Sequence, residues 1–254
     1  MAHVLVTGGT GTLGSALLPR LAARGHEVRS LSRHGASGPA LGAVPSGVSH
    51  LRGDVRSGEG LAEAMAGMDA VIHAATSGGR SVEVQGTAKV VAAARTAGAH
   101  LIYMSIVGVD TMRFAYYRSK WDAEKLVESG GGRWTIQRAT QFHDLLNRFL
   151  SWRVFPVTTH LSFQPVDTGD VSERLADLVD SGESGRAEDF GGPVVVPMRA
   201  LAAARRRIAG SGTLLVPLPA VGLLGDFDRG SHLCPDHAHG RVTWEEWLRA
   251  RVGS

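Results

Sequence analysis

A tyrosine and a lysine four positions apart are the strongest candidates for chemistry in this chain. Tyr116 and Lys120 stand in the segment FAYYRSKWDAEKLV. If this segment is helical, both side chains lie on one face, and the ammonium lowers the pKa of the phenol from its reference of about 10. A tyrosine tuned in this way can protonate a developing alkoxide. Tyr117, three positions before Lys120, is a competing proton donor.

Ser105 adds a second hydroxyl to this group of residues. It stands in YMSIVGVD, where we expect a strand to end, and its hydroxyl could hydrogen-bond the same carbonyl oxygen as the tyrosine. A serine at a strand end is usually only a turn residue, and a Tyr–Lys spacing of four also recurs by chance. Together, in this order behind a glycine-rich loop, Ser105, Tyr116 and Lys120 are the predicted catalytic residues.

The glycine-rich loop lies near the N-terminus, in HVLVTGGTGTLG. A short apolar strand there runs into a turn and then into an amphipathic helix, which is the context of a dinucleotide phosphate loop. Gly8 can adopt the positive φ of the turn, Gly11 leaves room for a pyrophosphate, and Gly14 lets the helix pack on its strand. The N–H groups at the start of the helix would face the anion. The predicted loop contacts are Gly8, Thr10, Gly11, Thr12, Leu13 and Gly14.

The end of the second expected strand indicates which dinucleotide binds. A site that prefers NAD usually places a carboxylate there to accept from the ribose hydroxyls. This chain reads VRSLSRH, so Ser32 stands at that position and Arg33 follows it. A 2′-phosphate would meet a hydroxyl and a cation, which predicts a preference for NADP(H) over NAD(H). The alternative is that Arg33 is an ordinary exposed arginine.

Further cofactor contacts are expected at the ends of later strands. The carboxylate in LRGDVRS could accept from the adenine amino group, and the small residues of VIHAAT would let the cofactor lie close to the sheet. The ammonium that tunes the tyrosine would also reach the nicotinamide ribose. These predicted contacts are Asp54, Val55, Ala74, Ala75, Thr76 and Lys120.

Strands and helices alternate through the first half of the chain. We expect strands near 3–7, 27–31, 48–52, 70–75, 100–105 and 133–138, with helices between most of them. This pattern predicts an α/β fold, a Rossmann-like doubly wound parallel sheet with a small C-terminal substrate lobe. Residues 1–140 would form the dinucleotide-binding core, and 141–254 mainly the lobe, with some segments returning to the core. Residues 220–240 should be a loop rich in glycine and proline, and its glycines would permit closure as a lid.

Composition limits the class of protein. The chain has 254 residues, 43% hydrophobic content and a net charge of +3, as expected of a globular protein with a full core. It contains no apolar run long enough for a membrane span and no signal peptide, so we predict neither membrane contact nor export. The lone Cys234 fits the reducing cytoplasm, the predicted location. The basic run Arg205–Arg207 lacks interleaved aromatic residues, and we expect no nucleic-acid partner.

The chain resembles the atypical short-chain dehydrogenase/reductase superfamily, in its NmrA-like NAD(P)-binding branch. The resemblance rests on TGGTGTLG, on IVGVD followed by YYRSKWDAEKLV, and on WTIQRATQFHDLL, PVDTGDVSERLADLV and GGPVVVPMRAL. It implies a Rossmann domain with a small C-terminal substrate lobe, cofactor bound at Gly8, Gly11, Gly14 and Arg33, and an active site of Ser105, Tyr116 and Lys120. The chain departs from the pattern at Ala139, where many relatives carry proline.

Other polar residues have weaker claims to a function. Gln141, Phe142 and His143 follow the sixth expected strand and are the predicted substrate pocket, although His143 could equally pack against its own helix. The segment SHLCPDHAHG offers metal-ligand types in His232, Cys234, His237 and His239, but it has no matching second pair. We therefore predict no metal.

Three functions fit these residues. The first is an NADP(H)-dependent oxidoreductase that transfers hydride to a small carbonyl or quinone acceptor. The second is a redox-sensing regulator that binds NAD(P) without turnover, as some NmrA-like proteins do. The third is a redox-neutral isomerase or epimerase that recycles tightly held cofactor. The Tyr–Lys pair favours the enzyme with a small-molecule substrate, because a sensor needs no tuned phenol. The sequence leaves the choice between a monomer and a homodimer open.

Overall fold

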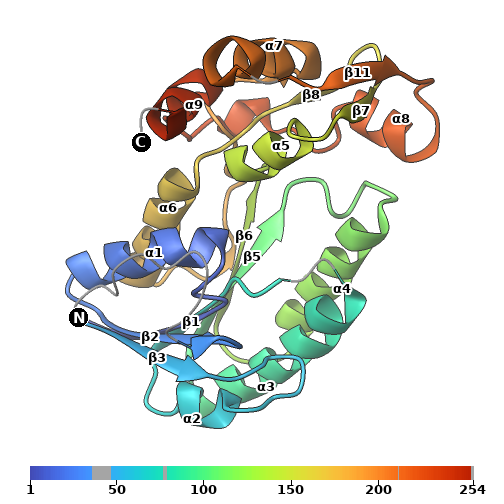
Figure 1. Ribbon diagram of the computed structural model, residues 1–254. Helices are drawn as coiled ribbons and strands as arrows, with labels where there is room; N and C mark the ends of the chain where they lie inside the picture. Colours follow the sequence, from blue (N-terminus) through green and yellow to red (C-terminus); the bar gives the residue numbers. More distant parts are fainter. Residues whose placement is uncertain (36–46, 77–78, 211, 253–254) are drawn as a thin grey trace. The chain divides into compact units, whose positions relative to one another are not determined.

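A seven-stranded sheet organises the computed structural model, which describes residues 1–35, 47–76, 79–210 and 212–252 (Figure 1). The strand order is β3-β2-β1-β4-β5-β6-β9, and β1 pairs in parallel with both β2 and β4. The order reverses at β1, which is the switch point where doubly wound sheets bind dinucleotides. The strands are β1 (His3–Thr7), β2 (Glu27–Ser32), β3 (Val48–Arg52), β4 (Ala70–His73), β5 (His100–Ile106), β6 (Trp134–Ala139) and β9 (Gly185–Arg186).

The predicted α/β fold class is confirmed. Each of the six expected strands is present within a residue or two of its expected bounds. The central strands β1, β4 and β5 are almost wholly buried, as expected inside a parallel sheet, whereas β3 at the edge has no buried residue. The seventh strand, β9, was not predicted. It is two residues long and pairs with β6 through Thr135 and Ile136, too short for any pattern of alternation to show in the sequence.

The chain divides into two compact units. The first unit comprises 1–105, 119–137 and 172–187, and the second comprises 106–118, 138–171 and 188–254. The helices that belong mainly to the first unit are α1 (Thr12–Ala23), α2 (Leu61–Met65), η2 (Ser81–Gly86, a π-helix), α3 (Thr87–Ala97), α4 (Ala115–Ser129) and α6 (Thr168–Ser181). The chain enters α4 in the second unit and passes into the first between Arg118 and Ser119.

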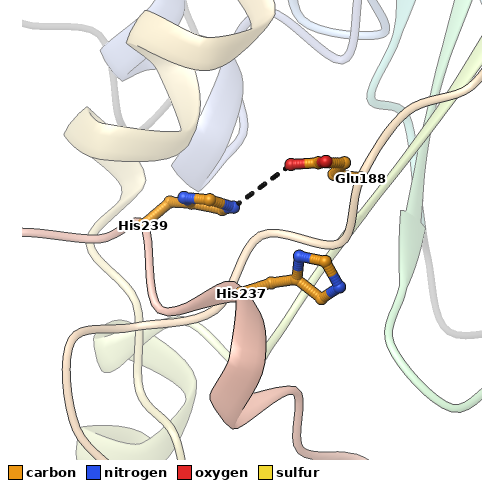
Figure 2. A group of neighbouring side chains, drawn as sticks. All are labelled: Glu188, His237 and His239. Atoms are coloured by element: carbon orange, nitrogen blue, oxygen red, sulfur yellow. Dashed lines mark ion pairs between the residues drawn. The ribbon is translucent and has the colours of Figure 1, made fainter.

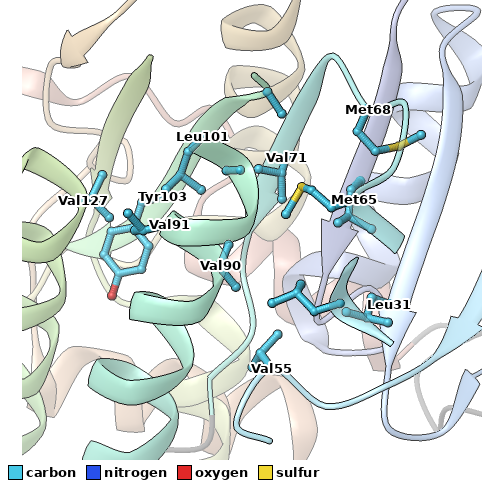
Figure 3. Close-up of a cluster of buried hydrophobic side chains, with 14 of the residues drawn as sticks. Leu31, Val55, Met65, Met68, Val71, Val90, Val91, Leu101, Tyr103 and Val127 are labelled. Carbon is cyan, nitrogen blue, oxygen red and sulfur yellow. The ribbon is translucent and has the colours of Figure 1, made fainter. Parts of the chain in front are cut away.

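The core of the first unit fills one face of the sheet (Figure 3). Leu5, Val71 and Tyr103 from the strands are fully buried, and they pack with apolar residues of α2, α3 and α4. Burying each large apolar side chain contributes about 1.5–3 kcal/mol. This packing fixes the strand ends that carry the predicted cofactor contacts. On the other side, α1 and α6 are joined by ion pairs from Arg20 and Arg24 to Glu173.

The second unit has an aromatic core of its own. Trp244 and Trp247 stack with their ring centroids 5.5 Å apart, and they pack with Leu146, Phe163 and Leu201. Its elements are α5 (His143–Phe149), β7 (Val154–Val157), β8 (Ser162–Phe163), β10 (Val196–Pro197), α7 (Met198–Ala209), β11 (Leu214–Pro217), α8 (Gly222–Asp228), η3 (Pro235–His237) and α9 (Trp244–Val252).

Residues 220–240 are more ordered than the loop that we expected. They contain α8 and the short 3-10 helix η3. The buried carboxylate of Asp226 joins this segment to Arg113, which is distant in the sequence. It accepts from the backbone N–H of Arg113 at 3.1 Å and forms an ion pair with the Arg113 guanidinium at 3.0 Å. These bonds hold the pKa of Asp226 below its usual range.

Among the described residues, no helix combines the length and apolarity that crossing a bilayer requires.

Candidate functional site

The turn between β1 and α1 and the first turn of α1 are packed so closely that Gly8, Gly9 and Gly14 cannot be replaced without movement. Gly8 has φ +77°, and a Cβ there would lie 2.8 Å from the backbone N and Cα of Ala75. A Cβ on Gly14 would lie 2.3 Å from the carbonyl oxygen of Gly8. The loop is also fixed by Gly8 N–H donating to the Leu31 carbonyl at 2.9 Å. The structure therefore brings the predicted loop together with Ala75.

The start of α1 suits an anion. Gly11 is the N-cap residue, with extended backbone angles and no side chain to satisfy the first N–H groups of the helix. Gly11 and Thr12 are exposed, whereas Leu13 is buried against the sheet. Helix N-termini of this kind bind phosphate through backbone donors and the helix dipole. The residues present thus fit the phosphates of a dinucleotide, with Thr10 and Thr12 in the same exposed turn.

The end of β2 places Ser32 and Arg33 in different environments. Ser32 is buried, and its hydroxyl donates to the carbonyl of Gly35 at 3.1 Å. Arg33 is exposed beyond the strand end. The serine hydroxyl is therefore already engaged as a donor, and the guanidinium is the group of this pair that can meet an added phosphate.

Asp54 follows β3 by two residues, since the strand has its expected bounds of Val48–Arg52. Its Oδ1 atom accepts from the backbone N–H of Arg56 at 2.8 Å, and its carbonyl accepts from Gly58. An aspartate followed by such a turn uses its carboxylate locally, which the strand pattern alone did not reveal. The neighbouring Val55 is buried and belongs to the core of the first unit.

The residues after β4 connect the glycine loop to a buried carboxylate. Ala74 donates its N–H to the Thr7 carbonyl at 3.2 Å, beside the loop. The hydroxyl of Thr76 donates to Oε1 of Glu83, in η2. Glu83 is 1% exposed and was not predicted as a functional residue. It could have been found, because Glu83, Thr87 and Val90 share the spacing of one buried helical face.

Lys120 points into the first unit and pairs with Glu83. Its side chain is buried, and Nζ lies 3.3 Å from Oε2 of Glu83, an ion pair without hydrogen-bond geometry. The ammonium also donates to the Met104 carbonyl at 2.7 Å and lies 4.5 Å from the centre of the Tyr103 ring. Removing such charges from water costs several kcal/mol per ion, so the cation persists here because these groups surround it.

A buried histidine next to this pair stays neutral. His73 ends β4, and its two ring nitrogens lie 2.7 Å from the Thr7 hydroxyl and 3.1 Å from the Thr87 hydroxyl. Burial, and secondly the charge of Lys120, lower the pKa of His73 to about 3. The ammonium is therefore the cation of this cluster at neutral pH.

Ser105 is held by a second buried carboxylate. The serine is 2% exposed, and its hydroxyl donates to Oε1 of Glu124 at 2.5 Å. The other oxygen of Glu124 pairs with Nη1 of Arg186 at 2.8 Å. Since the Ser105 hydroxyl donates its hydrogen bond to Glu124, it can accept a hydrogen bond from a ligand. It cannot donate one to a ligand unless it leaves Glu124.

The two candidate phenols in the second unit differ in exposure. Tyr117 is 4% exposed, and its hydroxyl accepts from Nε2 of Gln141 at 3.0 Å. Burial raises the pKa of Tyr117 well above its usual value. Tyr116 is half-buried, and its ring lies edge-on to that of Phe114, with the ring centroids 6.4 Å apart. Tyr117 is thus the worse proton donor, because burial disfavours its phenolate.

The predicted pocket residues are mostly packed. Phe142 is the N-cap of α5 and bridges to Val166. His143 is fully buried, with its ring centroid 5.7 Å from that of Trp244 and 5.5 Å from that of Trp247, and its Nε2 lies 3.1 Å from the Val242 carbonyl. Burial lowers the pKa of His143. These contacts favour the packing alternative for His143, and they leave Gln141 in contact with a candidate phenol.

The histidine-rich segment also separates into different environments. His232 is fully buried between Phe163 and Phe227, and Nε2 lies 2.8 Å from the Ser162 carbonyl. Burial lowers the pKa of His232 to about 4, and it raises the pKa of the Cys234 thiol to about 12. Both residues therefore serve packing. His237 and His239 lie elsewhere, beside Glu188.

The chain is similar in sequence to known proteins. A family model described as NAD(P)H-binding matches residues 8–181. The chain is 34% identical over 165 residues to a 3-beta-hydroxysteroid dehydrogenase of Mycolicibacterium neoaurum, covering 57% of this chain and 39% of that protein. It is 37% identical over 115 residues to a 2-alkyl-3-oxoalkanoate reductase of Stenotrophomonas maltophilia, covering 42% of this chain and 34% of that protein. The chain thus spans well under half the length of these relatives.

Solved structures with the same fold extend over the whole chain. An NADPH-dependent quinone oxidoreductase of Escherichia coli, complexed with NADPH, has a TM-score of 0.80 at 17% identity and covers 98% of this chain and 99% of its own. An epimerase of Methanothermobacter thermautotrophicus has a TM-score of 0.79 at 17% identity, covering 99% and 91%. These structures share the fold of this chain. The family model, which matches more than half of the chain, shows that the chain belongs to the NAD(P)H-binding family, in agreement with the resemblance to the atypical short-chain dehydrogenases/reductases.

Proposed function

We propose that this protein is an NADP(H)-dependent oxidoreductase that reduces a small carbonyl or quinone acceptor. The observation that carries the proposal is the buried ammonium of Lys120, which contacts Glu83 and the Met104 carbonyl. Lys120 lies on α4, the helix that also contains Tyr116. A cation buried at this cost is typical of a functional site. The named dehydrogenase and reductase among the relatives support the same class of reaction.

The chain's own residues would divide the reaction between them. The glycine loop and the start of α1 would bind the phosphates, and the Lys120 ammonium would orient the ribose. When bound, the reduced nicotinamide supplies the hydride. Tyr116 would then give its proton to the oxygen of the acceptor as negative charge develops there. Ser105 would accept a hydrogen bond in this site, because its own hydroxyl group donates to Glu124.

The preference for NADP(H) rests on Arg33. Its exposed guanidinium follows the strand end at which NAD-binding sites carry a carboxylate. An Arg33→Ala variant should weaken NADPH binding by roughly tenfold or more and leave NADH binding nearly unchanged, because one charged hydrogen-bond partner of the phosphate is lost. Arg199→Ala, at an exposed arginine of α7, is the matched control. Equal loss for both cofactors, or tighter binding of NADH by the wild type, contradicts the preference.

The activity is tested by titrating the protein with NADPH and then adding quinones, aldehydes and ketones while following the absorbance of NADPH. Oxidation of NADPH that depends on both protein and acceptor supports the oxidoreductase and identifies its acceptor class. Tight binding without oxidation across the panel contradicts it and favours the redox-sensing regulator. Dinucleotide that remains bound through purification, with no net oxidation, would indicate the isomerase or epimerase.

A further inference from the structure

Two histidines and a glutamate of the second unit lie together, and none of them takes part in the proposed function (Figure 2). One ligand atom from each of Glu188, His237 and His239 lies within 4.8 Å of the other two. Nε2 of His239 lies 3.6 Å from Oε2 of Glu188. Figure 2 shows these three side chains coming from two neighbouring segments, which are distant in the sequence.

The backbone holds these two segments side by side. Gly191 donates its N–H to the His237 carbonyl at 2.8 Å, and Gly240 donates to the Gly191 carbonyl at 2.8 Å. A Cβ on Gly240 would lie 3.0 Å from Cα of Gly192, so the segments are in close contact. The ring of His239 also packs against Phe190 at 5.7 Å. The three candidate ligands are therefore placed by rigid backbone and not by long flexible loops.

Two imidazoles and one carboxylate form a typical donor set for zinc and neighbouring transition metals. Donors about 2.0–2.1 Å from a tetrahedral zinc lie roughly 3.3–3.5 Å from each other. The His239–Glu188 separation of 3.6 Å is close to that spacing. The remaining atoms lie within 4.8 Å and would need to move by about an ångström, which rotation of these partly exposed side chains permits. Water can occupy the fourth position.

We propose that Glu188, His237 and His239 bind one divalent transition-metal ion, zinc in the first instance. The ion would join the segment 188–192 to the segment 234–240 in the second unit. Its effect would be to stabilise the folded chain, since a ligand that binds the folded form preferentially shifts the unfolding equilibrium. This role is independent of the proposed oxidoreductase.

The test measures zinc binding to protein without a purification tag, without cofactor or acceptor, by competition with a chromophoric chelator. The wild type should bind one equivalent. His237→Ala and His239→Ala should each weaken binding by at least about tenfold, because each removes one of three protein ligands. Circular dichroism of each variant confirms that it folds. Since all three side chains are at least partly exposed, the variants should retain the fold.

The matched control is His3→Ala. His3 pairs with Glu27 at 3.1 Å, with side-chain exposures of 45% and 65%, close to the 45% and 72% of His239 and Glu188. It differs in lacking a second imidazole, so its loss should leave zinc affinity unchanged. Zinc should also raise the Tm of the wild type and not that of the His237→Ala/His239→Ala double variant. No zinc binding by the wild type, equal binding by the double variant, or an equal loss in His3→Ala overturns the proposal.

Discussion

The two units place their buried charged groups and imidazoles in different surroundings. In the first unit, the buried side chains near the strand ends include charged ones, namely Lys120, Glu83 and Glu124. In the second, His143 and His232 are fully buried beside aromatic rings, each with one ring nitrogen close to a backbone carbonyl. Burial lowers the pKa of both histidines, so they are neutral. In the first unit both members of the Lys120–Glu83 pair are buried, whereas the buried carboxylate of the second unit, Asp226, pairs with an Arg113 side chain that is 58% exposed. The comparison teaches that only the first of these two pairs removes both charges from water.

The largest expected effect comes from breaking the buried pair of the first unit. Glu83→Leu should lower the free energy of unfolding by about 3–5 kcal/mol, because it leaves the Lys120 ammonium buried without its partner. The double variant Glu83→Leu/Lys120→Met should recover most of this loss, since neither charge remains. Urea unfolding measures both. If the double variant is no more stable than the single one, the pair is not the cause, and the contrast between the units fails.

The next effect concerns the half-buried phenol. Tyr116→Phe should reduce turnover by roughly 100-fold or more while NADPH still binds, because the proton donor is lost and the binding loop is untouched. Tyr117→Phe is the control, since its hydroxyl is buried against Gln141. Steady-state kinetics with the acceptor found in the panel compares the two. A larger loss from Tyr117→Phe would reverse the assignment of the proton donor.

The third effect sharpens the comparison through pH. Burial lowers the pKa of His232 in the folded protein to about 4, from the value of 6.5 for an unperturbed histidine. Its neutral form therefore stabilises the fold fully above about pH 6.5, and this contribution falls as the pH drops toward 4, by up to about 1.4 kcal/mol per pH unit. Urea unfolding at several pH values should show a flatter dependence in His232→Phe. An unchanged slope would mean that the unfolding free energy is not linked to this histidine.

The smallest effect is expected at Ser105. Because its hydroxyl donates to Glu124, Ser105→Ala should change kcat by less than about tenfold, below the range usual for loss of a proton-transfer group. Measuring kcat and KM separately shows which step is affected. A loss as large as that of Tyr116→Phe would mean that the serine leaves Glu124 and donates to the substrate during turnover.

Sequence patterns predicted the parts of this molecule that depend on local rules. The strands were recognisable as apolar runs, and Gly8 and Gly14 as positions that need the absence of a side chain. Glu83 and Glu124 escaped prediction because their roles depend on partners far along the chain, Lys120 and Arg186. The helix α8 escaped because proline- and glycine-rich composition hides the tertiary bonds of Asp226 that order it.

The late return of the chain to the first unit bears on how that unit is made. Its sheet gains β9, and its helix α1 gains the carboxylates of Glu173, Asp177 and Asp180 as partners for Arg24, from residues 172–187. The glycine loop at residues 8–14 is synthesised well before residues 172–187, which belong to the same unit. Such distant pairings slow folding, because loop closure must precede them. A nascent chain would therefore complete its first unit only after residues 172–187 had been synthesised.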